Sequence, residues 1–112
     1  MDKDLEINIV RNGAHSVVHL KGDVDLKTSP ELRTAILDLL IKRGQERVVL
    51  DLKGVGYVDS SGIATLVEGL KEAKSRKARF ILSGVGEGVR HVLDLTRLTS
   101  AFEIVKTAEE VR

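Results

Sequence analysis

The sequence predicts an α/β fold: a single domain in which an opening β-hairpin precedes alternating β/α units, giving a mixed β-sheet with packed α-helices. Three observations predict it. An Asn-Gly pair follows a period-two apolar pattern, a continuous apolar run typical of a buried strand lies mid-chain, and stretches of helical apolar spacing separate the strand-like segments. The 112 residues are 42% hydrophobic, which is enough for one core. We therefore expect one domain over residues 1–112.

The N-terminal segment predicts the hairpin. Apolar residues alternate over residues 5–9, as in a half-buried strand. Asn12 and Gly13 are the residue pair preferred in a two-residue hairpin turn, and residues 16–20 then form the returning strand. Residues 22–25 (Gly-Asp-Val-Asp) end that strand.

A first helix is predicted from Thr28 onward. Pro30 favours the first helical turn, and Thr28 with Glu31 has the spacing of a capping box. Apolar residues recur at helical spacing over 32–40, and Gly44 stands where the helix is expected to end.

The middle of the chain predicts a buried strand and a second helix. The apolar run over 47–52 indicates a strand covered on both faces. A connection with two glycines over 53–58 leads into a helix from about residue 60 to residue 73. The basic residues between Lys71 and Arg79 are typical of the C-terminal end of a helix, where the partial charge is negative.

The C-terminal third repeats the alternation. We expect a short buried strand over 78–82, a glycine-rich loop over 84–88, a short helix over 89–95 and a strand over 102–105. A short last helix over 107–110 begins and ends with the residues of a second capping box.

Composition argues against several classes of function. The net charge of +1 and three aromatic residues predict no direct nucleic-acid binding. There is no cysteine, and the three histidines do not have a metal-ligand spacing, so we expect no metal and no cofactor. The N-terminus lacks the apolar segment of a signal peptide and no run is long enough to span a bilayer, which predicts a cytoplasmic protein without membrane insertion.

The segment Asp59-Ser60-Ser61-Gly62 is the main candidate site, because it lies where a predicted strand turns into a helix. The first turn of a helix has unpaired N–H groups and a partial positive charge. Ser60 or Asp59 caps the helix, or the serine carries a hydroxyl whose added phosphate the helix end would stabilise.

Three other chemistries fit less well. A serine-hydrolase elbow needs a glycine two positions before and after the serine, but Val58 precedes Ser60 and Ile63 follows Ser61, so we expect no catalytic residues. The glycine run over 84–88 lacks the spacing of a dinucleotide fingerprint. A receiver-like domain with Asp51 as phosphoacceptor remains an alternative, with Asp23 and Asp25 as its nearest candidates for a magnesium site.

Four segments of the chain, in matching order, resemble the STAS family, the sulfate transporter and anti-sigma factor antagonist domain. The first comprises residues 48–52 and 58–63, with the Asp-Ser-Ser-Gly motif; the others are Leu20–Asp25, Ser83–Val85, and residues 95–98 with 102–104. The resemblance covers essentially the whole chain and implies the STAS fold. The chain departs from the family at Arg97, where a glycine is usual, which questions the geometry of that turn.

The resemblance implies a regulatory switch and no enzyme activity. In the antagonist branch, the first serine of the motif is phosphorylated by a serine kinase that is also the anti-sigma factor, and a PPM-type phosphatase removes the phosphate. Carried onto this chain, the phosphoacceptor is Ser60, and Asp25 matches an acidic position beside it. The implied partner-binding residues are Asp25, Asp59, Ser60, Ser61 and Gly62. Alternatives within the family are a docking subunit of a lipid-transport ABC system and a stressosome component.

Overall fold

A computed structural model describes residues 5–111 of the chain. Its single sheet has five strands in the order β1-β2-β3-β4-β5; β1 is antiparallel to β2 and the other neighbours are parallel. The strands are β1 (Leu5–Asn12), β2 (His15–Gly22), β3 (Arg47–Gly54), β4 (Arg79–Ser83) and β5 (Glu103–Val105). The helices are α1 (Ser29–Leu37), α2 (Ser60–Ser75) and α3 (Glu87–Leu95). The predicted mixed sheet, opening hairpin and alternation of β/α units are confirmed.

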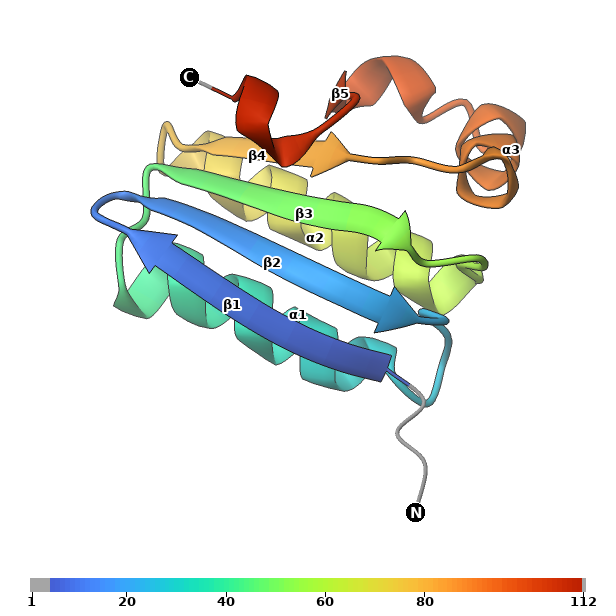
Figure 1. The fold of residues 1–112 in the computed structure, drawn as a ribbon, viewed down its shortest axis with the longest axis horizontal. Coiled ribbons are helices and arrows are strands. Elements are labelled where there is room, and N and C mark those ends of the chain that lie inside the picture. The colour runs from blue at the N-terminus through green and yellow to red at the C-terminus, as the bar shows by residue number, and fades with distance from the viewer. Residues whose placement is uncertain (1–4, 112) are drawn as a thin grey trace.

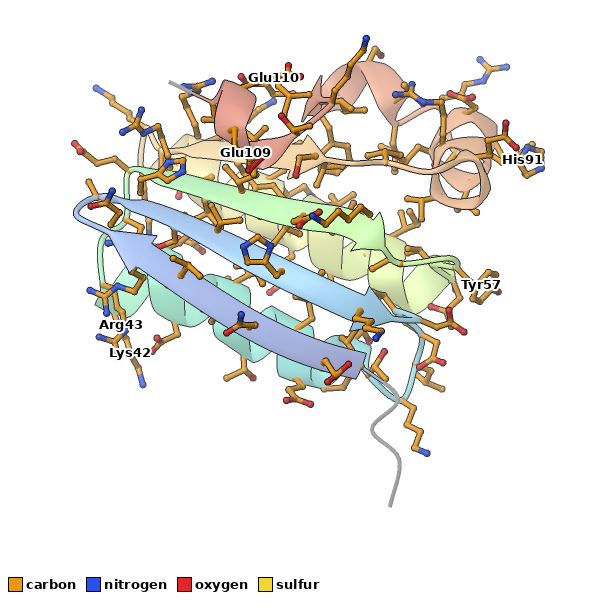
Figure 2. The ribbon with its side chains drawn as sticks, in the orientation of Figure 1. Lys42, Arg43, Tyr57, His91, Glu109 and Glu110 are labelled. Atoms are coloured by element: carbon orange, nitrogen blue, oxygen red, sulfur yellow. The ribbon has the colours of Figure 1, made fainter. Side chains whose placement is uncertain are left out.

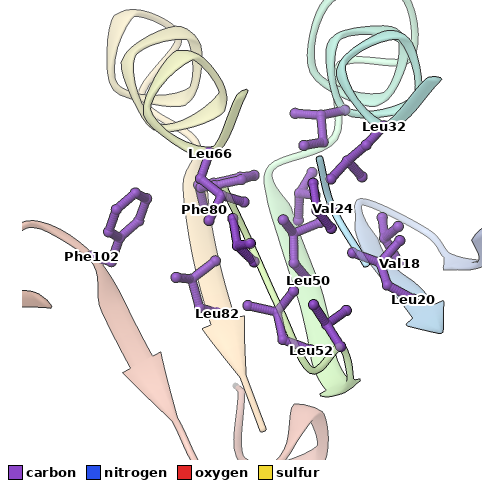
Figure 3. Packing of buried hydrophobic residues seen from close by; sticks show 14 of the residues in the cluster. Val18, Leu20, Val24, Leu32, Leu50, Leu52, Leu66, Phe80, Leu82 and Phe102 are labelled. Carbon is purple, nitrogen blue, oxygen red and sulfur yellow. The ribbon is translucent and has the colours of Figure 1, made fainter. Parts of the chain in front are cut away.

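Helices α1 and α2 lie side by side behind the sheet, while α3 lies beyond the end of β4 (Figure 1). The core fills the space between the sheet and these two helices, where side chains from both layers interdigitate (Figure 3). Val18, Leu50 and Leu82 enter it from the strands, and Leu32 and Leu66 enter it from the helices; none is more than 1% exposed. Burial of this apolar surface is the main force that fixes α2, and therefore its N-terminus, against the sheet.

The hairpin forms as predicted, with Asn12 paired to His15 and Gly13 at a φ of 62°. The register places Ile7 opposite Leu20 and Ile9 opposite Val18, so both isoleucines face the helix side of the sheet. Because β1 is an edge strand, this face is only partly covered, and Ile9 is 38% exposed.

Strand β3 is central, and its run from Val48 to Leu52 is buried, as predicted. Val48 and Leu50 face the helices, whereas Val49 faces the opposite side of the sheet. The C-terminal segment with the 3-10 turn Ala108–Glu110 contacts β3 there, in front of the sheet in Figure 1. Helices on one face and this segment on the other account for the continuous apolar pattern.

The predicted capping box at the start of α1 is wrong. The Thr28 hydroxyl donates to the Asp23 carbonyl (2.8 Å) and accepts from the Asp25 N–H (2.9 Å), so it is used in the preceding turn. The C-terminal end is as predicted: α1 continues as a π-helical turn, Asp38–Lys42, and ends before Gly44, which has a φ of 56°.

The C-terminal third differs from expectation in three details. Helix α3 begins at Glu87, so the predicted loop 84–88 is shorter by two residues. A 3-10 turn, Thr99–Ala101, was not predicted. The last helix is only a 3-10 turn, and Thr107 makes no side-chain cap, because the Glu110 N–H donates to the Thr107 carbonyl (3.2 Å) instead of to its hydroxyl.

The turn at Arg97 has the geometry that a glycine would favour. Arg97 has a φ of 59°, its N–H donates to the Asp94 carbonyl (3.1 Å), and the next N–H, of Leu98, reaches back to Leu93 (2.8 Å). This pattern is a Schellman motif, which closes a helix through one left-handed residue. Arg97 therefore adopts the left-handed conformation that a glycine would adopt without strain.

We expect Arg97→Gly to raise the free energy of unfolding by about 0.5–1 kcal/mol, because a left-handed conformation costs an L-residue about 1–2 kcal/mol and the flexibility of glycine returns part of it. Urea unfolding followed by circular dichroism measures the change. The control, Arg90→Gly within α3, should lower stability by about 1 kcal/mol. A loss of stability in Arg97→Gly would contradict the left-handed geometry.

Candidate functional site

Two loops meet at the carboxyl end of the central strands. The Val24 N–H donates to the Tyr57 carbonyl and the Asp59 N–H donates to the Val24 carbonyl, both at 3.0 Å, around an isolated parallel bridge between Val24 and Val58. The loop after β2 is thereby joined to the turn between β3 and α2. In parallel α/β sheets, this edge is where functional residues gather.

Asp59 caps α2. Its Oδ1 accepts the Gly62 N–H at 3.0 Å, as an N-cap side chain does, and its Oδ2 accepts the Leu26 N–H from the neighbouring loop at 3.1 Å. One carboxylate therefore fixes the helix end and the β2–α1 loop together. The alternative that Ser60 caps the helix is wrong, because the cap is the aspartate.

Ser60 is the first residue of α2, and it is exposed. Among residues 5–111, its hydroxyl has no hydrogen-bond partner, and neither has that of the half-buried Ser61. A hydroxyl without a partner, at the positive end of a 16-residue helix, is open to an incoming phosphoryl group. Of the two serines, Ser60 is the more accessible.

Asp25 organises the loop beside this helix end. Its Oδ1 accepts the N–H groups of Lys27 (3.0 Å) and Thr28 (3.1 Å), and the residue is half-buried. The adjacent Leu26 N–H binds Asp59, so Asp25 lies one residue from the contact that joins the two loops. Asp25, Asp59 and the two serines thus belong to one continuous surface.

Gly62 differs from the two serines before it because it is buried. A Cβ atom there would lie 2.6 Å from the Val58 Cγ1 and 2.8 Å from both the Val24 Cγ1 and the Val24 carbonyl oxygen. The glycine of the motif therefore lets α2 pack directly on the bridge between the two loops.

Two large apolar side chains stand out on the same loops. Leu26 is 75% exposed and Tyr57 is 52% exposed. Figure 2 shows Tyr57 projecting from the end of the molecule. Sequence reasoning did not select either residue, although each is a large apolar residue within a polar or glycine-rich loop, and that pattern was the available signal.

Asp51 lies elsewhere, on the sheet face opposite the helices. It is 5% exposed, with Oδ2 2.7 Å from the His19 Nδ1 and Oδ1 accepting the Lys53 N–H at 3.2 Å. Asp23 is exposed and Asp25 binds backbone groups of its own loop. Within residues 5–111, no three acidic or histidine side chains are grouped to hold a metal ion. The receiver-like alternative therefore finds no support in this geometry.

His15 lies in an environment that disfavours its charged form. Its pKa lies below the usual 6.5, because of burial first and the nearby positive charges of Arg47 and Arg79 second. It lies on β2, on the sheet side away from the helices, and takes no part in the site around Ser60.

Within residues 5–111, no helix has the length and apolar character needed to cross a membrane.

The model of the STAS domain family matches residues 6–111. The chain belongs to the STAS domain family. A curated relative from Listeria monocytogenes, the anti-sigma-B factor antagonist, is 27% identical over 103 residues, which cover 90% of this chain and 88% of the relative. The anti-sigma F factor antagonist of Paenibacillus polymyxa is 26% identical over 95 residues, covering 85% of this chain and 81% of the relative.

Solved structures agree with the STAS fold. A putative anti-sigma factor antagonist from Thermotoga maritima has a TM-score of 0.86 and 22% identity, covering 93% of this chain and 89% of that chain. The anti-sigma factor antagonist SpoIIAA in its unphosphorylated form has a TM-score of 0.75 and 17% identity, covering 94% and 92%. The phosphorylated form of Bacillus SpoIIAA has a TM-score of 0.72 and 20% identity, covering 94% and 95%. These similarities support the architecture described above.

Proposed function

We propose that this protein is an anti-sigma factor antagonist that is switched off by phosphorylation of Ser60. Unphosphorylated, it binds an anti-sigma factor in the cytoplasm and so frees the sigma factor. The anti-sigma factor is also the serine kinase, and a PPM-type phosphatase restores the active form. The observation that carries the proposal is the exposed, unpartnered Ser60 hydroxyl at the start of α2, where Asp59 already serves as the cap. The names of the curated relatives support the same role.

The chemistry required of this chain is limited to presenting a nucleophile. The Ser60 Oγ attacks the γ-phosphorus of ATP bound to the kinase. An O–P bond forms, the bond from the γ-phosphorus to the bridging oxygen breaks to release ADP, and the hydroxyl proton passes to a base of the kinase. The chain contributes the geometry of an ordered helix start, since the Asp59 contacts with Gly62 and Leu26 hold both flanks of the serine. We therefore propose no catalytic role for the protein itself.

The phosphate on Ser60 is stabilised by the start of α2, but it disfavours docking of the anti-sigma factor. The N–H groups of Ser60 and Ser61 precede the first intrahelical hydrogen bond and can face a phosphate, so the phosphoprotein keeps its fold. The phosphate adds about −1.5 to −2 charges at pH 7 beside the Asp59 carboxylate. A partner that desolvates this surface then has to accommodate two adjacent negative groups.

The exposed apolar side chains indicate how the unphosphorylated form binds. Leu26 and Tyr57 stand on the two loops that Val24 and Asp59 connect, next to the serine. Aromatic and aliphatic side chains in the centre of an interface supply most of its binding energy, and a charge placed among them is costly. We propose that these two residues, together with Asp25, Asp59, Ser60 and Ser61, contact the anti-sigma factor, while Gly62 sets the packing beneath them.

The test is phosphorylation by a cognate anti-sigma factor kinase. With ATP, intact-mass spectrometry should show one added phosphate on the wild type and on Ser61→Ala, and none on Ser60→Ala. Peptide mapping should place the phosphate on Ser60. The Ser61→Ala variant is the matched control, because it removes the neighbouring hydroxyl from the same helix turn.

Two results would overturn the assignment. Phosphate on Ser61 would move the acceptor by one residue. No phosphate at all, with a kinase that is active on itself or another substrate, would make the chain a passive STAS docking module, as in a lipid-transport or stressosome assembly. Labelling of Asp51 by acetyl phosphate would instead favour the receiver-like mechanism.

A further inference from the structure

Helix α3 packs directly on the turn that carries Tyr57 and leads to Ser60. α3 and this turn lie at the same end of the molecule, beyond the carboxyl ends of β3 and β4 (Figure 1). The contact is made by Gly88, the second residue of α3, where a Cβ atom would lie 2.6 Å from the Gly56 carbonyl oxygen. Real Cβ atoms do not come so near a backbone oxygen, so this approach of helix to turn requires a glycine.

The helix side of the contact is rigid. Val89 and Leu93, which follow Gly88 on α3, are both 0% exposed and belong to the core. A retreat of α3 would displace both side chains, and a close-packed interior resists such a displacement. An added methyl group at residue 88 would therefore move the turn rather than the helix.

The turn side of the contact is held at both ends and exposed between them. Val55 and Val58 are 4% and 1% exposed, and Val58 forms the bridge to Val24. Gly56 and Tyr57, which lie between the two buried valines, are exposed. The Gly56 carbonyl belongs to the planar peptide that joins these two residues, so a displacement of this carbonyl rotates the backbone of Tyr57.

We propose that Gly88 is a positioning residue: through the Gly56 carbonyl, the first turn of α3 sets the direction in which Tyr57 meets the anti-sigma factor. Ser60 is held separately, by the two contacts of the Asp59 carboxylate. The contact of α3 therefore acts on docking and leaves the acceptor hydroxyl in place. This role rests on the proposed function, because it requires a partner that docks on Tyr57.

Binding and phosphorylation of Gly88→Ala by the purified anti-sigma factor kinase test the proposal. We expect the Kd to rise about tenfold, because a displaced tyrosine loses the contacts of an interface hot spot. In the phosphorylation reaction, the KM for this protein should rise by a similar factor while kcat stays within about twofold, since only docking is impaired. A merely structural role of Gly88 would not produce this separation of KM from kcat.

Gly86→Ala is the matched control. A Cβ atom there would meet no atom within 4 Å, although the residue is the N-cap of the same helix. Alanine is a poor N-cap residue, so this variant should be less stable than the wild type and yet bind with the same Kd. Gly88→Ala has the opposite character, because alanine favours a helix more than glycine does and binding is nevertheless expected to weaken.

A double-mutant cycle identifies the side chain on which the contact acts. Tyr57→Ala should weaken binding by itself. In that background, Gly88→Ala should change the Kd by less than about twofold, because the ring that it displaces is absent. Equal losses in both backgrounds would overturn the role of Tyr57.

The free protein gives a second readout that needs no partner. In nitrogen–proton correlation NMR spectra, the backbone amide signals of Gly56 and Tyr57 should shift in Gly88→Ala and stay near their wild-type positions in Gly86→Ala. The amide signal of Gly62, which is bound by Asp59, should stay in place in both variants.

Three further results would overturn the proposal. They are a wild-type Kd for Gly88→Ala, unchanged amide signals in the turn, and a Gly88→Ala variant that circular dichroism shows to be unfolded, because the contact would then support the whole fold. A wild-type protein that does not bind the anti-sigma factor would instead contradict the proposed function. The amide signals would still decide whether Gly88 sets the conformation of the turn.

Discussion

Gly62→Ala is expected to lower the free energy of unfolding by about 2–3 kcal/mol, because the added methyl group has no free space. The new Cβ would meet the Val58 Cγ1 at 2.6 Å and the Val24 carbonyl oxygen at 2.8 Å. The carbonyl cannot rotate away, because it accepts the Asp59 N–H. Helix α2 must therefore shift at the end that carries Ser60. Urea denaturation measures the effect.

Gly56→Ala is the matched control, since a Cβ there would meet no atom within 4 Å and the residue lies in the same turn. It should change stability by less than about 0.5 kcal/mol. A double-mutant cycle identifies the cause: in a Val58→Ala background, Gly62→Ala should cost less than in the wild type, because the nearest clashing atom is gone. Equal costs in both backgrounds would show that the contact with Val58 is not responsible.

Local signals in the sequence were sufficient for the fold. The Asn12-Gly13 turn, the apolar run in β3 and the helical spacing in α2 each depend on neighbouring residues, and all three elements appear where predicted. The exposed position of Ser60 at the start of α2 also follows from local order, because an apolar strand and an amphipathic helix on either side of a short turn leave that turn at the surface.

Long-range contacts explain what the sequence left open. Thr28 has the spacing of a capping residue, yet its hydroxyl is used by Asp23 and Asp25 in the preceding turn. The second oxygen of Asp59 binds Leu26, 33 residues away, and no pattern along the chain indicates that pairing. The packing role of Gly62 likewise depends on Val24, which reaches it only through the folded sheet. Residue types can be predicted locally, but partners separated by a strand or a helix cannot.

Ser60→Asp is expected to weaken binding to the anti-sigma factor by about 1–3 kcal/mol, or roughly fivefold to more than a hundredfold in Kd. A carboxylate at residue 60 would stand next to the Asp59 carboxylate, which is already held by Gly62 and Leu26 and cannot turn away from it. The phosphorylated protein should bind more weakly still, because phosphate carries more charge than a carboxylate. Isothermal titration with the purified anti-sigma factor measures the Kd of Ser60→Asp and the Kd of the phosphorylated protein. Treatment of the phosphorylated protein with a PPM-type phosphatase should restore its affinity.

Two comparisons separate charge from other causes. Ser60→Ala should bind like the wild type and stay bound in the presence of ATP, since it removes only the phosphoacceptor. Ser100→Asp adds the same charge at an exposed position in the connection between α3 and β5, and it should also bind like the wild type. Raising the salt concentration should reduce the penalty of Ser60→Asp, because partly exposed charges are screened. The loss caused by Leu26→Ala should persist, because it reflects apolar contact. If Ser60→Asp binds as tightly as Ser60→Ala at low salt, the partner does not cover the start of α2, and repulsion at Ser60 is not the basis of the switch.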